Sequence, residues 1–158
     1  MLKLKWLWVV CFVALTAWIG FAFAQTANPG TIKTVKLPSG EEVFDISGEW
    51  DVYVENLNAL SIFGTYQQVF KITQEGNSFT GIRLKDNPPP SPGKAGSTCM
   101  QGEVDKNGIK KIELITSAGA RLPSVCKISE DGNKINIDGY DSELPTRSQL
   151  VRQTLIRK

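Results

Sequence analysis

Hydrophobic and polar residues alternate along much of the chain, beginning near residue 49. Trp50, Val52 and Val54 point to one side of an extended chain, and the residues between them are largely polar. This period of two is typical of a strand with one buried face. No stretch has a sustained helical period, and Gly or Pro interrupts every candidate. The sequence therefore predicts an all-β protein.

Turn signals divide the rest of the chain into further strands. Three tight turns contain Asn and Gly, the residues that short hairpins favour: 75–77, 106–108 and 130–133. With these turns as boundaries, eight strands are predicted: 49–55, 66–74, 78–84, 98–105, 109–116, 121–129, 134–140 and 149–157.

The lengths of the connections alternate along the chain. The tight turns alternate with the connections 56–65, 85–97, 117–120 and 141–148, three of which are long. In an up-and-down meander, alternate connections lie at the same end. We therefore expect an eight-stranded antiparallel up-and-down barrel over residues 46–158, with one closed end and one open mouth. Its interior either holds a small ligand or is filled by its own side chains.

Residues 25–45 precede this barrel. Pro38-Ser39-Gly40 separates two short extended segments, 31–37 and 41–46, which reads as a hairpin ahead of the main fold. An extended arm that lies across the barrel or reaches a partner is the alternative.

The first 24 residues have the layout of a secretory signal peptide. Lys3 and Lys5 precede an apolar run over 6–23, and the segment ends Ala22-Phe23-Ala24, with small residues where a signal peptidase cuts. We expect a cleaved signal and an exported protein, periplasmic or secreted. An uncleaved membrane anchor is the alternative, since the apolar run reaches the lower limit of a bilayer span.

The charge of the chain argues against nucleic acid as a partner. The chain has 18 basic and 16 acidic residues, and two of the lysines lie in the signal segment. The rest of the chain is balanced and has no basic cluster, so electrostatic support for binding a phosphate backbone is lacking.

Removal of the signal leaves two cysteines, Cys99 and Cys126, and an even number in an exported chain suggests a disulfide. One strand separates the two cysteines in a meander, which puts their Cα atoms roughly 9 to 10 Å apart. A disulfide requires less than about 7 Å. The bond therefore requires Cys99 to lie in a folded-over loop, or Pro123 to distort the strand of Cys126.

Residues able to perform catalysis are scarce. The chain contains no histidine, and its Ser and Thr hydroxyls have no evident activating partner. Without histidine or a paired Cys-x-x-Cys spacing, a metal site is not expected either. We expect a protein that is not an enzyme and has no cofactor.

Gly48-Glu49-Trp50 resembles the G-x-W signature of lipocalins and the wider calycin group. The hairpin 70–81 is similar to one repeated in small bacterial lipocalin-like domains, and 127–135 echoes it. The resemblance implies that Trp50 closes one end of the barrel and packs against an arginine of the last strand, Arg157. No T-D-Y motif stands at 130–133, where larger lipocalins have one.

Binding is the expected function. The first hypothesis is a barrel that carries or sequesters a small apolar or amphipathic ligand. Its candidate contact residues are apolar residues of the connection 56–65, together with apolar strand residues that are expected to face the barrel interior. They are Leu57, Leu60, Ile62, Phe63, Phe70, Ile72, Met100, Val104, Ile112 and Leu114. The alternative is a protein-binding barrel, such as an envelope or secreted hydrolase inhibitor, that presents the Pro-rich loop 87–93 and the arm 31–46.

Overall fold

A computed structural model describes residues 32–57, 64–141 and 149–158 of the chain. These residues form short strands and no helix, in this order: β1 (Thr34–Lys36), β2 (Glu42–Phe44), β3 (Gly48–Asn56), β4 (Thr65–Glu75), β5 (Ser78–Arg83), β6 (Thr98–Asp105), β7 (Gly108–Ile115), β8 (Arg121–Ile128), β9 (Lys134–Tyr140) and β10 (Gln149–Arg157). In the described residues, no helix is long and apolar enough to cross a membrane.

Strands β3 to β10 close into a barrel in the order β10-β3-β4-β5-β6-β7-β8-β9, and all neighbours are antiparallel. Closure joins β3, the first strand of the barrel, to β10, the last, with Trp50 of β3 opposite Arg157 of β10. The predicted eight-stranded up-and-down barrel is confirmed, and each strand begins and ends within one residue of its expected position.

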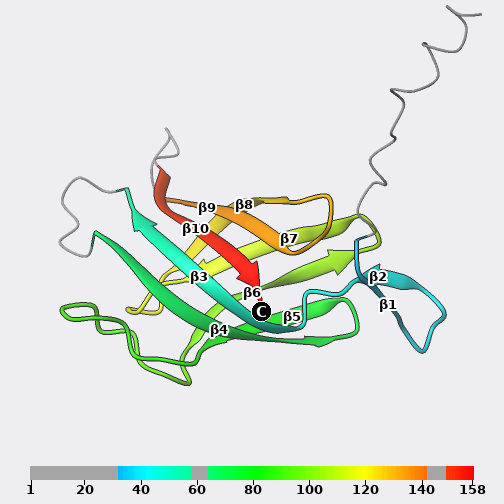
Figure 1. Ribbon diagram of the computed structural model, residues 1–158, viewed down its shortest axis with the longest axis horizontal. Helices are drawn as coiled ribbons and strands as arrows, with labels where there is room; N and C mark the ends of the chain where they lie inside the picture. Colours follow the sequence, from blue (N-terminus) through cyan, green and yellow to red (C-terminus); the bar gives the residue numbers. More distant parts are fainter. Residues whose placement is uncertain (1–31, 58–63, 142–148) are drawn as a thin grey trace, which may run out of the picture. The chain divides into compact units, whose positions relative to one another are not determined.

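The two ends of the barrel differ in their connections. The tight turns β4–β5, β6–β7 and β8–β9 lie at one end, toward the right of Figure 1. The long β5–β6 connection and the β7–β8 connection lie at the other end, toward the left. We call the first the closed end and the second the mouth.

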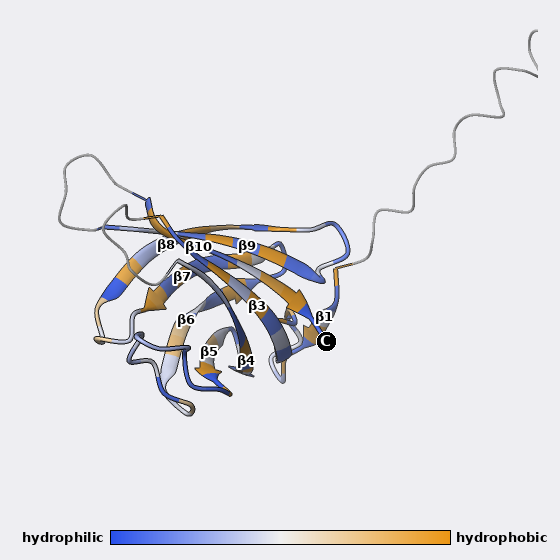
Figure 2. Cartoon of the chain, turned by 60° about the vertical axis from the view of Figure 1, so that its left-hand side comes forward, coloured by the Kyte–Doolittle hydropathy of each residue, from blue (hydrophilic) through white to orange (hydrophobic). Residues whose placement is uncertain are grey.

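Alternation along the strands separates the interior from the surface. On β3, Trp50, Val52 and Val54 are buried, whereas Tyr53 between them is exposed. Apolar and polar bands alternate in the same way along the other strands in Figure 2. Each large apolar side chain removed from water contributes roughly 1.5 to 3 kcal/mol.

The N-terminal hairpin β1–β2 packs against β6 and β7. Val43, Phe44 and Ile46 are completely buried and belong to the same apolar cluster as the barrel interior. Phe44 also packs on the β8–β9 turn at Gly132, where an added Cβ would lie 3.2 Å from its ring. The predicted hairpin ahead of the barrel is confirmed, and its second strand contributes Val43 and Phe44 to the apolar core, whereas β1 is exposed.

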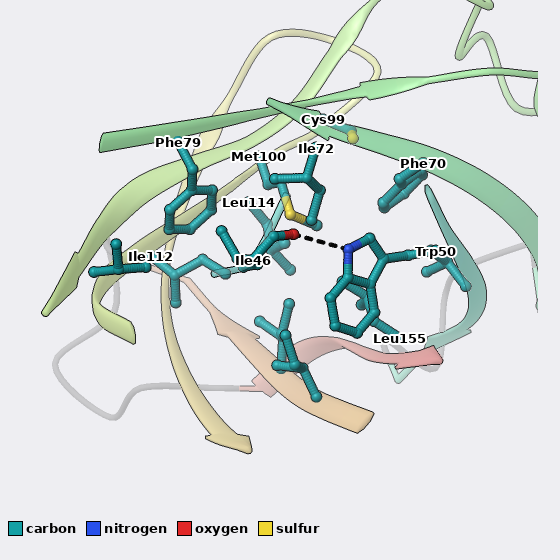
Figure 3. Packing of buried hydrophobic residues seen from close by; sticks show 14 of the residues in the cluster. Ile46, Trp50, Phe70, Ile72, Phe79, Cys99, Met100, Ile112, Leu114 and Leu155 are labelled. Atoms are coloured by element: carbon teal, nitrogen blue, oxygen red, sulfur yellow. Dashed lines mark hydrogen bonds between the residues drawn. The ribbon is translucent and has the colours of Figure 1, made fainter. Parts of the chain in front are cut away.

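Trp50 and Arg157 hold the closed end together. The indole nitrogen of Trp50 donates to the carbonyl of Ile46 at 3.0 Å, as Figure 3 shows. The guanidinium carbon of Arg157 lies 4.5 Å from the centre of the Trp50 ring, a cation–π arrangement. Arg157 also donates to the carbonyls of Ser47 and Asp45. The pair lies where the sequence resemblance implies, and its contacts are structural.

Asp45 links this end to the hairpin. Its carboxylate forms an ion pair with Lys33 at 2.7 Å and accepts a hydrogen bond from the backbone N–H of Ser47 at 3.0 Å. Burial alone would raise the pKa of Asp45, but the hydrogen bonds from Lys33 and Ser47 outweigh burial and hold the pKa below its ordinary value.

Candidate functional site

A pocket of about 500 Å³ occupies the mouth half of the barrel. Its walls come from inward-facing residues near the mouth ends of six strands, and from the β5–β6 and β7–β8 connections. The strand residues of the wall include Val54, Tyr66, Arg83, Leu114, Leu122, Val151 and Gln153. This volume lies within the range of about 300 to 1,000 Å³ typical of sites for small molecules.

Most of the pocket wall is apolar. Val54 and Leu114 are fully buried, and Leu122 is half-buried. Val52 on β3 and Ile112 on β7 lie two residues nearer the closed end than Val54 and Leu114, and both belong to the packed core. Alternation thus makes one continuous inward surface, which is covered by other side chains in the closed half and left partly uncovered at the mouth.

Arg83 is the one cationic residue among the described residues of the pocket wall. Its side chain is buried, with 6% of the residue's surface exposed. Nη1 donates to Ser97 Oγ at 2.9 Å and to the carbonyl of Thr98 at 3.0 Å. Nη2 donates to the carbonyl of Ile115 at 3.0 Å. Arg83 therefore ties the mouth ends of β5, β6 and β7 together.

No carboxylate of the described residues forms an ion pair with Arg83. Its three acceptors are a hydroxyl and two carbonyls, all of them neutral. The mouth pocket is therefore electropositive on this side.

Two buried amide side chains lie in the mouth half. Gln153 on β10 lines the pocket, and its Oε1 is buried without a hydrogen-bond partner. Gln68 on β4 donates through Nε2 to the carbonyl of Asp86 and to Asn87 Oδ1, but its Oε1 is likewise unpartnered. A buried polar atom without a partner costs about 1 to 3 kcal/mol, so both amide oxygens are unfavourably placed.

Asn87 fastens the β5–β6 connection to the mouth. Its Nδ2 donates to Ser91 Oγ at 2.7 Å, to Ser117 Oγ at 3.3 Å and to the Tyr66 hydroxyl at 3.4 Å. Gly93 allows this close fit, because an added Cβ would lie 2.3 Å from Asn87 Nδ2. Burial raises the pKa of Tyr66, so its hydroxyl stays neutral at ordinary pH.

The disulfide expected between Cys99 and Cys126 does not form, since both residues are free cysteines. A bulge in β6 opposite Gly81 and Ile82 places both Cys99 and Met100 in the interior. Cys126 lies two strands away, on β8. Met100 pairs with Leu114, which pairs with Leu122, and Cys126 lies four residues beyond Leu122. Because Cys99 precedes Met100, Cys126 lies about five residues, roughly 17 Å along the strand, from the position level with Cys99, and this offset together with two strand spacings exceeds the reach of a disulfide.

Burial also makes Cys99 unreactive. It raises the pKa of the thiol to about 12, so the nucleophilic thiolate is scarce at neutral pH. Burial raises the pKa of Cys126 as well. In the described part of the chain, no group of three or more His, Cys, Asp and Glu side chains is placed to hold a metal ion.

The ligand-contact residues expected from the sequence divide into three groups. Leu114 lines the pocket, and Leu57 is exposed beside it, its backbone N–H donating to the carbonyl of Leu150. Leu60, Ile62 and Phe63 lie outside the described residues. The other five do not line the pocket and are instead buried in the apolar core, where Figure 3 shows four of them: Phe70, Ile72, Met100 and Ile112, with Val104 as the fifth. For these five the expectation of ligand contact was wrong.

Several pocket residues were missed by the sequence reasoning. Tyr66 shares the inward phase of Phe70, and Gln153 shares that of Leu155. Their position along the strand distinguishes them, since inward residues nearest the long connections surround the opening. That signal is present in the sequence once the two ends of the barrel are assigned.

Comparison of the chain with family models, with curated proteins and with solved structures found no match.

Proposed function

We propose that this chain is an exported, non-enzymatic binding protein that holds a small apolar or amphipathic ligand in the mouth half of its barrel. The observation that carries the proposal is the pocket of about 500 Å³, with apolar walls and a few buried polar groups. This combination is the usual composition of a small-molecule site. Export is supported by the basic and apolar pattern of the first 24 residues.

The absence of histidine and the raised pKa values of both described cysteines support a binding role without catalysis. The resemblance of Gly48-Glu49-Trp50 to the lipocalin signature favours the same interpretation. The resemblance supports the proposal by analogy only.

A substitution that fills the pocket tests this function. Leu122→Trp adds a bulky ring to the β8 wall, and Val125→Trp on the same strand adds the ring to an exposed position. The amphipathic fluorescent probe anilinonaphthalene sulfonate should bind the unmodified protein and the Val125→Trp variant, and bind Leu122→Trp at least about tenfold more weakly. Equal binding by both variants would argue that the pocket is not the site.

Protein binding is the second candidate, and one observation favours it. Pro88, Pro89 and Pro90 are exposed, while Asn87 beside them is fixed by its hydrogen bonds. A rigid loop loses little entropy when a partner binds. Replacement of the three prolines by Ala should then weaken capture of a partner protein and leave the binding of anilinonaphthalene sulfonate unchanged.

A further inference from the structure

Arg83 carries a charge that the described protein does not neutralise. A buried ion is costly unless an opposite charge or a full set of hydrogen bonds compensates for it. Arg83 has three neutral acceptors for its five N–H donors. Two donors are therefore left in a residue that lines the pocket.

Two donors and a single positive charge match one particular anion. A carboxylate has two oxygens and one negative charge, and it forms paired hydrogen bonds with a guanidinium. A phosphate carries more charge and more acceptors, and the described pocket wall contains no second cation to satisfy them. No acidic residue in that part of the wall would repel a carboxylate.

The rest of the pocket wall indicates the chemistry of the rest of the ligand. Val54, Leu114, Leu122 and Val151 offer an apolar surface in the same pocket as Arg83. We infer that the ligand is an amphipathic carboxylic acid, with its carboxylate on Arg83 and its hydrocarbon part against these four residues. This inference depends on the proposed function, because it names the chemical class of the ligand for the same pocket.

The test compares two probes that share a hydrocarbon chain and differ in the head group. Dodecanoate and its methyl ester have the same chain, and only the first carries a carboxylate. Calorimetric titration at neutral pH should show that the purified protein binds dodecanoate at least about tenfold more tightly than the ester. Arg83→Gln should bind both probes equally, at the affinity of the ester. Arg121→Gln, at an exposed arginine that begins β8, should retain the preference.

Arg83 also joins three strands, so Arg83→Gln has a structural risk that Arg83→Lys reduces. The lysine keeps the charge but loses the forked donors, and it should keep only part of the preference. Equal binding of acid and ester by the unmodified protein would overturn the inference and leave the proposed function standing. Failure of both probes to bind would overturn the inference and count against the proposed function as well.

Discussion

The closed half and the mouth half of this barrel follow the same alternation of inward and outward residues, yet their interiors differ. In the closed half the inward positions hold Trp50, Ile72, Phe79 and Val104, and the hairpin adds Phe44. In the mouth half, polar side chains and smaller apolar ones line a pocket of about 500 Å³. An eight-stranded barrel is just wide enough to be filled by its own side chains. The hairpin therefore helps to complete the core at the closed end. At the mouth end, polar residues occupy inward positions and line the pocket.

The largest difference is expected when a side chain is removed from each half. Trp50→Ala should cost about 3 to 5 kcal/mol of unfolding free energy, because it leaves a large void in a packed core. Leu122→Ala should cost less than about 1.5 kcal/mol, since this half-buried side chain already borders open space. Urea unfolding of the two variants measures both values. Equal losses would contradict the division into a filled half and an open half.

The connection between hairpin and barrel can be weakened at Asp45. Asp45→Asn should cost about 1 to 2 kcal/mol at neutral pH, because the ion pair with Lys33 and the charge-assisted hydrogen bonds are lost. The lowered pKa gives the sign of the pH effect: the stabilisation is complete above the ordinary value of 3.8, and it disappears as pH falls through the lowered folded-state pKa. The unfolding free energies of the unmodified protein and of Asp45→Asn, measured from pH 7 to pH 2, should therefore become equal in acid. A constant gap would exclude ionised Asp45 as the cause.

A smaller effect of opposite sign is expected in the mouth half. Gln153→Leu removes a buried amide oxygen that has no partner, so it should raise the unfolding free energy by about 1 kcal/mol. The same substitution should not strengthen binding of a polar ligand. Loss of stability in this variant would show that Gln153 has a structural partner in solution.

The smallest effect concerns the cysteines. Because Cys99 and Cys126 are not joined, addition of a reducing agent should leave the melting temperature unchanged. A clear decrease in the melting temperature would show that a disulfide forms after all, and that β6 or β8 moves to permit it.

The barrel was predictable because tight turns and alternation are local properties of the sequence. The turns at Gly76, Asn107 and Gly132 determine where strands begin and end, and the alternation determines which residues are inward. The division of the interior was not predictable in the same way. Phe70 and Leu114 both face inward, but only Leu114 lines the pocket, whereas Phe70 is buried in the core beside Trp50, with which it pairs. The bulge that turns both Cys99 and Met100 inward depends on the packing of β5 and β6, which alternation alone does not specify.

Binding of a small molecule in the mouth half of the barrel can be tested on the protein as it is produced. The most direct measurement is native mass spectrometry of the protein isolated, without detergent, from the cells that produce it. We expect a discrete added mass that is lost on unfolding, that proves to be an amphipathic carboxylic acid, and that is absent from the Leu122→Trp variant. A bare mass for the unmodified protein, obtained under conditions in which its fold is intact, would contradict binding in the mouth half.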